Sequence, residues 1–374
     1  MPSVLKGMTW DHPRGFTSVV SSNELLAELC QSEVEWQARS LLAFGDQHIS
    51  EFYRENDLMI IDHPHVPDAV EAGAVIAFEE LISPETLHLL RLTSVGASHD
   101  SYQYRERQWA LAIDTAAQVS AFRPDRADGS PIFWSDVLDI AATGRLLWPY
   151  KPVDAFSTFA TLMAQKGKPL ASGSNFIDSK TALEVLSFMV ELAALIPAFC
   201  ASFNPIDAAE LLASSDDFDH SVCMYGYTNY SRSGFRANLL TYDDLPSFDG
   251  LASGSQLGGA GIAVSSASKD PVKAAEIAVL LSLPHVQSTT YVQGGGQPGN
   301  LVAWRSESAN LITNNFFRNT LRTLERAWVR PRLLGWPDVQ FHSSQIIHTA
   351  LVERSVNEAT VAAISDTFEK YIKE

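Results

Sequence analysis

The chain has 374 residues, of which 46% are hydrophobic and 19% charged, a composition typical of a globular protein with room for two hydrophobic cores. Its formal net charge of −17 excludes nucleic acids and anionic membranes as favourable partners, because both are negatively charged. No apolar run approaches the roughly 18 residues that a membrane-spanning helix needs, so membrane insertion is not expected.

The cysteines indicate reduced thiols. Cys30, Cys200 and Cys223 include no C-x-x-C pair, and Cys200 and Cys223 stand in apolar surroundings. We therefore predict buried free thiols and no disulfide framework.

The N-terminus leaves the compartment open. Residues 1–7 lack the basic start, apolar stretch and small-residue cleavage site of a secretory signal. We expect a periplasmic protein if a signal segment was removed from this sequence, and a cytoplasmic one if Met1 is the native start.

The N-terminal third alternates between short apolar runs and helix-like segments, which is the pattern of an α/β fold. The run over 58–61 is apolar throughout, which predicts a strand buried on both faces. In chain order we expect a strand over 4–9, a helix over 22–31, a strand over 39–44, a helix over 46–55, the strand over 58–61, and a strand with a turn over 74–81.

Two of these strands end in clusters that combine aspartate, histidine and proline. Ligands bind at the carboxyl ends of strands in open α/β sheets, so we expect both clusters to face a ligand. The candidate side chains are Trp10, Asp11 and His12 after the first strand, and Asp62, His63 and His65 after the strand over 58–61.

Helical patterns dominate the rest of the chain. No linker rich in Pro, Gly or Ser separates the halves, so two cores would be joined by strands that the chain crosses more than once. We expect helices over 134–142, 156–165, around 183–190, 271–283, 315–328 and 356–372, and a strand over 261–264.

Four segments, in order along nearly the whole chain, resemble the family 1 extracellular solute-binding proteins, the sugar-binding type of ABC importer. They are the strand and loop over 57–65, the run Q-W-A-L-A-I-D-T-A over 108–116, the helix start I-F-W-S-D-V-L over 132–138, and the glycine-rich strand over 257–265. The resemblance departs from the family in the missing signal segment and in the histidine-rich loops.

The resemblance implies an α/β fold: a two-lobed periplasmic-binding-protein-like (type II) clamshell with a central interlobe cleft. Lobe 1 would comprise 1–116 plus 258–306, and lobe 2 would comprise 117–257 plus 307–374. The hinge strands would lie near 114–122 and 254–261. The implied function is capture of a small polar ligand, a carbohydrate or hydroxylated acid, for import through an ABC permease, by a monomer without a cofactor.

Polar and aromatic residues supply further candidates for ligand binding, since rings stack on C–H surfaces and amides or carboxylates match hydroxyl groups. The segment from Tyr225 to Tyr230 combines tyrosines with Asn229, although it also fits a strand with half-buried tyrosines. The complete candidate set is Trp10, Asp11, His12, Asp62, His63, His65, Asp114, Tyr225, Tyr227, Asn229, Gly259, Gln297 and Arg330.

Three segments have two interpretations each. The glycine loop over 294–299 is either a cradle of N–H groups or a plain turn, and it lacks the Lys-Ser/Thr ending of a P-loop. Arg330 and Arg332 either pair with an acidic ligand or form salt bridges. The run over 148–151 is either an aromatic wall of the site or core packing.

Histidines raise two alternatives to ligand binding. His63 and His65 could ligate zinc with Asp11 or Asp62, but no H-E-x-x-H motif or cysteine cluster accompanies them, so no metal is expected. The second alternative is a cytoplasmic enzyme on the same clamshell, a lyase or isomerase acting on a hydroxylated metabolite. Its acid–base candidates are His12, Asp11, His63 and His65. The sequence contains no G-x-S-x-G elbow, so acyl chemistry is not indicated.

Overall fold

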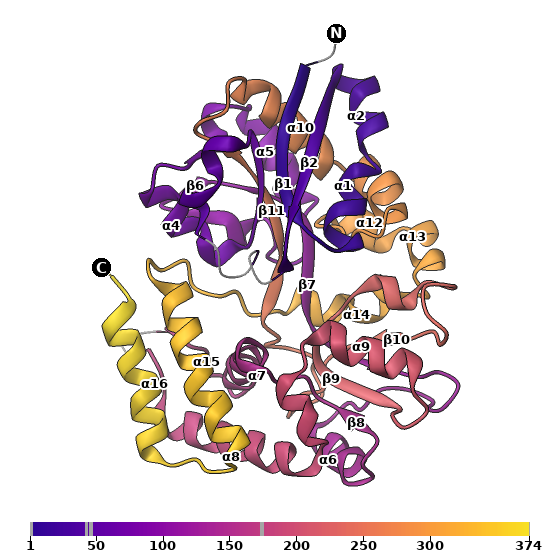
Figure 1. Cartoon of the computed structure of the whole chain (residues 1–374), viewed down its shortest axis with the longest axis vertical. Helices are drawn as coiled ribbons and strands as arrows, with labels where there is room; N and C mark the ends of the chain where they lie inside the picture. Colours follow the sequence, from indigo (N-terminus) through magenta and orange to yellow (C-terminus); the bar gives the residue numbers. More distant parts are fainter. Residues whose placement is uncertain (1–2, 42–43, 45–47, 173–175, 374) are drawn as a thin grey trace. The chain divides into compact units, whose positions relative to one another are not determined.

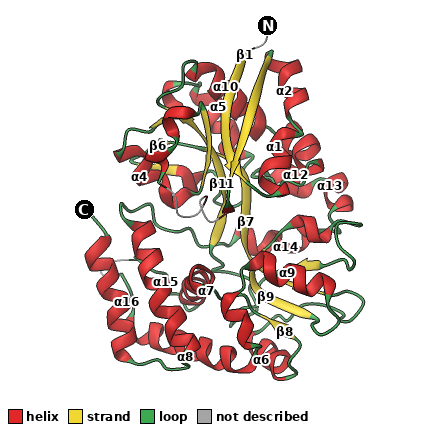
Figure 2. Ribbon diagram, viewed as in Figure 1, coloured by secondary structure: helices red, strands yellow, loops and turns green. Residues whose placement is uncertain are grey.

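The computed structural model describes residues 3–41, 44, 48–172 and 176–373, which form two compact units (Figures 1 and 2). Unit 1 comprises Met1–Ala116, Gly258–Ile312 and Arg332–Leu334, and unit 2 comprises Ala117–Leu257, Thr313–Pro331 and Gly335–Glu374. Within the described residues, no helix is both long and apolar enough to span a membrane.

The sheet of unit 1 has parallel strands at its centre. Strand β1 (Ser3–Trp10) pairs in parallel with β2 (Ser32–Arg39) and with β3 (Leu58–Ile61), which is fully buried as predicted. Strand β11 (Leu257–Ser265) returns antiparallel to β3 and to the short β4 (Val75–Ile76). The apolar run of β3 therefore lies between two neighbouring strands inside the sheet.

The second strand was predicted at the wrong place. The expectation was a strand over 39–44, but β2 ends at Arg39. Along β2, Ser32, Val34 and Trp36 are buried and the residues between them are exposed, because successive side chains of a strand face opposite sides of the sheet. The charged residues at every second position are the outward face of this strand, and that alternation was the available signal.

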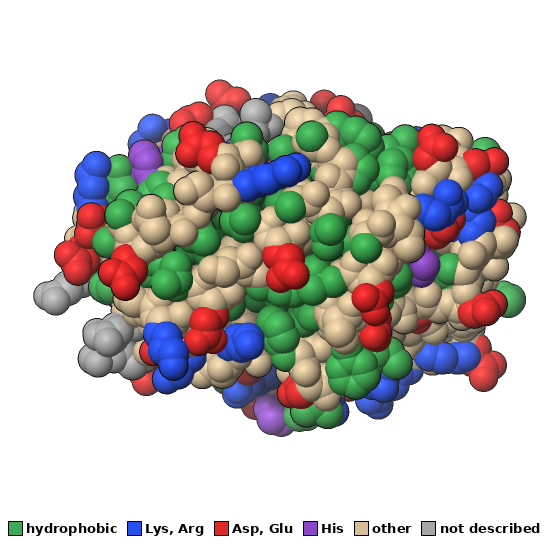
Figure 3. Space-filling model, turned by 90° about the horizontal axis from the view of Figure 1, so that it is seen from below, with side chains coloured by type: hydrophobic (Ala, Val, Ile, Leu, Met, Phe, Trp, Pro, Cys, Tyr) green, Lys and Arg blue, Asp and Glu red, His purple; other side chains and the backbone are tan. Residues whose placement is uncertain are grey.

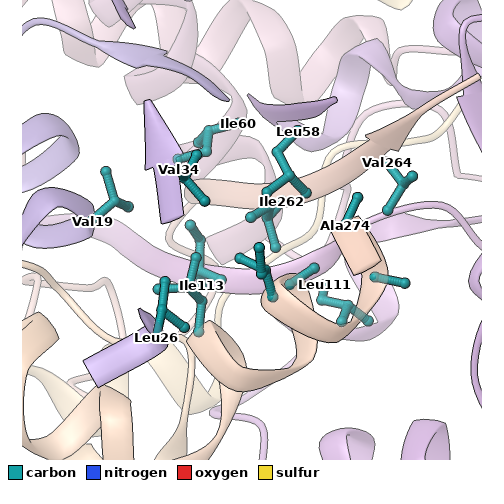
Figure 4. Close-up of a cluster of buried hydrophobic side chains, with 14 of the residues drawn as sticks. Val19, Leu26, Val34, Leu58, Ile60, Leu111, Ile113, Ile262, Val264 and Ala274 are labelled. Atoms are coloured by element: carbon teal, nitrogen blue, oxygen red, sulfur yellow. The ribbon is translucent and has the colours of Figure 1, made fainter. Parts of the chain in front are cut away.

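A cluster of aliphatic side chains forms the core under this sheet (Figure 4). Val34, Leu58, Ile60 and Ile262 from the strands meet Leu26 of α2, and all are buried. Complete burial of each such side chain contributes roughly 1.5–3 kcal/mol relative to exposure. The helices of unit 1 are α1 (Ser18–Val20), α2 (Asn23–Cys30), α4 (Val66–Glu71), α5 (Pro84–Leu92), α10 (Pro271–Ser282), α11 (Pro284–Val286), α12 (Leu301–Arg305) and α13 (Glu307–Ile312).

The helix expected over 46–55 does not form. Residues 46 and 47 lie outside the described residues, and the remainder makes two single 3₁₀ turns, Ile49–Glu51 and Tyr53–Glu55. The chain turns here to place Ile49 and Phe52 in a small core against β3, rather than presenting one continuous helical face.

The sheet of unit 2 is built on β7 (Leu111–Phe122), whose residues beyond Ala116 belong to this unit. Strands β9 (His220–Tyr225) and β10 (Thr241–Asp243) pair antiparallel with β7, and β8 (Leu146–Leu147) pairs in parallel with β9. The helices are α6 (Trp134–Ala142), α7 (Pro152–Gln165), α8 (Ser179–Leu195), α9 (Pro205–Ser214), α14 (Phe316–Glu325), α15 (Trp336–Val352) and α16 (Glu358–Tyr371).

Most helices of unit 2 match the expected ranges, and α6 has the expected bounds. Helices α9 and α15 were missed; α15 packs against both α7 and α16 (Figure 2). Its buried face includes Ser343 and Ser344 beside Val339 and Ile347, so hydroxyl groups interrupt the apolar periodicity on which a sequence prediction depends.

Two of the boundaries between the units fall inside regular strands. The first passage falls after Ala116 in β7 and the second after Leu257 in β11. Further boundaries follow Ile312, Pro331 and Leu334, and α13 is held to α12 by hydrogen bonds from the Asn310 amide to the carbonyls of Trp304 and Ser306. The three cysteines are free and buried, which confirms the prediction of reduced thiols.

Candidate functional site

Polar residues gather at one edge of the unit 1 sheet. Because β1, β2 and β3 run parallel, their carboxyl ends deliver Trp10, Arg39 and Asp62 to the same edge. Trp10 stands opposite Arg39 in the register, and the backbone N–H of Asp11 donates to the Arg39 carbonyl at 2.7 Å. The loops after β1 and β3, separate in sequence, are therefore brought to one place.

The indole of Trp10 is held at this edge by packing. Its ring centroid lies 4.9 Å from that of Phe44, and only 3% of the residue is exposed. A Cβ atom at position 15 would collide with the indole, so Gly15 lets the following turn pass directly beside the ring. Asp11, the next residue after Trp10, is exposed.

His12 acts on its own loop. Its Nδ1 accepts a hydrogen bond of 3.1 Å from the backbone N–H of Arg14, which caps the π-helical turn Pro13–Thr17. A neutral imidazole that accepts at Nδ1 carries its proton on Nε2. His12 can therefore present an N–H group, but its other nitrogen already serves the fold.

A buried ion pair lies behind this edge. Arg14 donates from Nε to one oxygen of Asp114 at 2.8 Å and from a terminal nitrogen to the other oxygen. Arg14 is 5% exposed and Asp114 is 1% exposed. Burial raises the pKa of Asp114, and the Arg14 guanidinium opposes that rise. Both carboxylate oxygens are thus bound within unit 1.

Gly259 and Gln297, two further candidates, pack against the backbone of Asp114 and Thr115. Gly259 has a φ of +127°, and a Cβ there would clash with the Asp114 carbonyl and stand 2.7 Å from the Thr115 Cα. The Gln297 side-chain amide donates to the Thr115 carbonyl at 3.0 Å, and the Thr115 N–H donates back to the Gln297 carbonyl. These residues hold β7 in place.

The glycine loop packs closely against its surroundings. A Cβ on Gly294 would stand 2.6 Å from the Ser21 hydroxyl, and one on Gly296 would overlap the ring of Tyr291. A Cβ on Gly299 would stand 2.5 Å from the Ala112 carbonyl. Close backbone approach therefore accounts for these glycines, in agreement with the plain-turn interpretation.

The loop after β3 pairs its own aspartate with its own histidine. The Asp62 carboxylate accepts from the His63 N–H at 2.8 Å, and His63 Nδ1 lies 3.2 Å from the same oxygen. His63 is fully buried beside Tyr102, and His65 is 9% exposed. Across the ranges that the structure describes, no group of three or more His, Cys, Asp or Glu is arranged to hold a metal ion.

Arg39 is a charged group that sequence reasoning missed. Its guanidinium lies 4.2 Å from the ring centroid of Phe52 and 5.5 Å from that of Phe44, and donates to the Ile60 carbonyl at 3.4 Å. Burial lowers its pKa to about 10, so it stays cationic at neutral pH. Its position at the carboxyl end of β2 was the available signal. The prediction of that strand over 39–44 put Arg39 at the start of the strand and concealed it.

The tyrosine-rich segment of unit 2 begins at the carboxyl end of β9. Tyr225 is the last residue of that strand and is partly exposed, as the half-buried-strand interpretation expected. Tyr227 is 7% exposed and Asn229 3% exposed, at the 3₁₀ turn Thr228–Ser231. A Cβ on Gly226 would stand 2.6 Å from the Phe316 ring, which explains the glycine between the two tyrosines.

The remaining candidates of unit 2 lie inside its packing. Arg330 is 4% exposed, and one of its terminal nitrogens lies 3.4 Å from the Gln340 side-chain oxygen. Trp148 is fully buried and donates to the Thr158 hydroxyl at 3.1 Å. The core-packing interpretation therefore holds for Trp148.

Of the comparisons with known proteins, the comparison of structures finds matches. No protein-family model matches the chain, and no curated protein matches its sequence. Solved structures match throughout: the GacH receptor of Streptomyces glaucescens (13% identity, TM-score 0.81, covering 100% of this chain and 99% of that one) and maltose-bound MalE3 of T. maritima (15%, 0.80, covering 98% and 99%). A solute-binding protein of Thermotoga lettingae bound with α-D-tagatose also matches (17%, 0.79, covering 98% and 99%).

These likenesses confirm the fold class that the sequence implied. TM-scores near 0.8 over nearly complete chains establish the same arrangement of elements, even at identities of 13–17%. The chain therefore has the periplasmic-binding-protein-like (type II) α/β fold of these solved structures.

Proposed function

We propose that this chain is a solute-binding protein that captures a small polar ligand, a carbohydrate or a related hydroxylated compound, and delivers it to an ABC permease. The observation that carries the proposal is whole-chain likeness to binding proteins whose solved complexes contain maltose, α-D-tagatose or acarbose. Within that class, two domains close around the ligand, and contact with both stabilises the closed form.

The residues of each unit suit such a ligand. In unit 1 the sheet edge offers Asp11 and Asp62, whose carboxylates accept hydrogen bonds from hydroxyl groups, beside the ring of Trp10. In unit 2 the end of β9 offers Tyr225 and Tyr227, whose rings match the C–H faces of a sugar. We propose that these two strand-end groups provide the ligand contacts.

The setting follows from the same proposal. Solute-binding proteins of this class work outside the cytoplasmic membrane, so we propose an extracytoplasmic, monomeric protein. Its net charge of −17 disfavours nucleic acid, and basic side chains on the face drawn in Figure 3 are scattered among acidic and apolar ones.

The enzyme alternative is not favoured. The structural neighbours are binding proteins, and two of the four proposed acid–base residues, His12 and His63, already contact their own loops. His12 caps a helical turn through Nδ1, and the buried His63 lies against its neighbour Asp62. General acid–base catalysis needs a group that is positioned to exchange protons with substrate.

The test is a binding screen with a turnover control. Isothermal titration calorimetry and thermal unfolding are run with maltose, D-tagatose, ribitol and acarbose, followed by other hydroxylated compounds. A ligand at 1,000 times its Kd adds about 4 kcal/mol to stability, so binding raises Tm. Saturable 1:1 binding with the compound recovered unchanged by NMR supports the proposal. Consumption of a bound compound, or no binding across the panel, contradicts it.

A further inference from the structure

A buried amide in unit 2 connects the tyrosine at the end of β9 to helix α7. Gln256 is 1% exposed, and its side-chain nitrogen donates to the Tyr225 hydroxyl at 2.8 Å and to the Ser157 hydroxyl at 3.0 Å. The Ser157 hydroxyl donates its own proton to the Val153 carbonyl at 3.0 Å, so it can only accept from Gln256. This chain of donors determines how the Gln256 amide is oriented.

The same glutamine is bound through its backbone to a second buried amide. The Gln256 N–H donates to the Thr161 hydroxyl at 2.9 Å, and that hydroxyl donates to the Gln118 side-chain oxygen at 2.7 Å. The Gln118 side-chain nitrogen then donates to the Cys223 carbonyl in β9 at 3.0 Å. Gln118 also stands opposite Tyr225 in the register of β7 and β9, so the network closes into a ring.

The hydrogen-bonded ring contains a residue next to each of the two strand passages of the chain. Gln118 lies two residues beyond the passage after Ala116, and Gln256 lies one residue before Leu257, the last residue ahead of the second passage. The two segments are also bonded directly, because the Ser255 hydroxyl donates to the Gln118 carbonyl at 2.7 Å. A displacement of Tyr225 therefore acts on the strand in which the chain enters unit 2 after Ala116 and on the strand in which it leaves after Leu257.

One atom in the ring lacks a partner. The side-chain oxygen of Gln256 is buried and has no hydrogen-bond partner among the residues that the structure describes. Such a group is costly, and an apolar side chain of similar shape would avoid the cost. The glutamine is therefore better explained by what its nitrogen positions than by stability.

We propose that Gln256 is a positioning residue for Tyr225. We further propose, in a step that rests on the proposed function, that its hydrogen-bond network transmits ligand contact at Tyr225 to the two strand passages. In this arrangement a ligand bound by Tyr225 stabilises one geometry of residues 117–119 and 255–257. The site and the joints of the protein then respond together, because buried polar networks change as a unit.

The first experiment needs no ligand. Amide hydrogen exchange is measured on peptides covering 116–120 and 254–258 in the wild type, Tyr225→Phe, the near-isosteric Gln256→Met, and the double variant. The matched control is Tyr230→Phe, which removes a tyrosine hydroxyl bonded to Glu210 at 2.7 Å in the same segment but outside the ring. We expect each ring variant to raise exchange in both peptides, with no further rise in the double variant.

Exchange that changes only near residue 225, additive effects in the double variant, or an equal effect of Tyr230→Phe would overturn the proposal. Tyr225→Phe removes only the hydroxyl oxygen and keeps the aromatic side chain. This variant therefore still decides the question if Gln256→Met fails to fold.

The second experiment uses whichever of maltose, D-tagatose, ribitol or acarbose binds the wild type. Gln256→Met should weaken that binding about five- to tenfold, and should have no further effect when Tyr225 is already Phe. Equal weakening in both backgrounds contradicts a role through Tyr225. If no compound of the whole binding screen binds the wild type, the proposed function fails, whereas the ligand-free exchange result still decides the network.

Discussion

Arg14 and Asp114, 100 residues apart in sequence, form a two-point ion pair in the interior of unit 1. Arg14 belongs to the turn that follows Trp10, and Asp114 to the part of β7 just before the chain leaves this unit. The pair therefore anchors the loop that carries the candidate residues Trp10, Asp11 and His12 to a central strand.

Removing one member of this pair should be costly. Arg14→Met leaves a buried, uncompensated carboxylate, and we expect a loss of about 3–5 kcal/mol in the free energy of unfolding, measured in urea at pH 7. The matched control is Arg91→Met, because Arg91 pairs with Asp100 at the surface with 58% of its side chain exposed. That variant should lose under about 1 kcal/mol. Equal losses would contradict an anchoring role.

His99 should make the protein less stable in mild acid. Burial lowers its pKa to about 4 from 6.5, so the folded state disfavours the charged form. Above pH 6.5 both states are neutral; as the pH falls from 6.5 to 4 the unfolded state takes up the proton and stability declines, by up to about 3 kcal/mol.

The check for His99 compares urea unfolding at pH 7 and pH 4.5 in the wild type and in His99→Gln. The variant should lose less stability between the two pH values. His88→Gln, at an exposed position of α5, serves as the control and should retain the dependence of the wild type. A pH dependence that His99→Gln leaves unchanged would refute the assignment.

Asp154 should have the opposite dependence. It lies in the first turn of α7 with 4% exposure, and one carboxylate oxygen lacks a hydrogen-bond partner within the described part of the chain. Burial raises its pKa to about 7, with Lys151 opposing the shift and Asp207 adding to it. Stability should therefore fall as the pH rises from 3.8 to 7.

Asp154→Asn should then stabilise the protein at pH 8 by up to about 4 kcal/mol, and hardly at all near pH 4. Unfolding curves at both values measure the difference, with Asp366→Asn on the exposed face of α16 as a control that should change neither. A variant that is destabilised at pH 8 would show that the ionised carboxylate is bound by a compensating partner.

Gly259 should tolerate no side chain. Its φ of +127° and the close approach of Asp114 and Thr115 predict that Gly259→Ala lowers the free energy of unfolding by about 2–4 kcal/mol. Gly129→Ala offers the comparison, because a Cβ there meets no atom within 4 Å. That change should stay within about 1 kcal/mol. A neutral Gly259→Ala would mean that β11 can shift away from β7.

Asp62 provides the direct test of the candidate site. Asp62→Asn retains the shape and removes the charge, and we expect a 10- to 100-fold loss of affinity for a panel ligand, since hydrogen bonds to charged groups contribute about 1.5–3 kcal/mol. Calorimetry gives the affinity, and Asp366→Asn controls for net charge. Unchanged affinity would place the ligand away from this loop.

Local patterns explain why much of the fold was predictable. The run from Leu58 to Ile61 is apolar at every position because its strand is covered on both faces, and α6 is marked by the regular spacing of its buried residues. Failures occurred where polar residues are buried, as with Ser343 in α15, or where charges line an exposed strand face, as with Glu33 in β2.

The sequence by itself determined the α/β class, the strand ends that carry Trp10 and Asp62, and an acidic surface, because these follow from local periodicity and from composition. Only the tertiary structure decided which residues are partners: Arg14 with Asp114, Arg39 with the rings of Phe44 and Phe52, and Gln256 with Tyr225. Such pairs join positions 31 to 100 residues apart or lie at strand ends set by register, and no local pattern encodes distances of that kind.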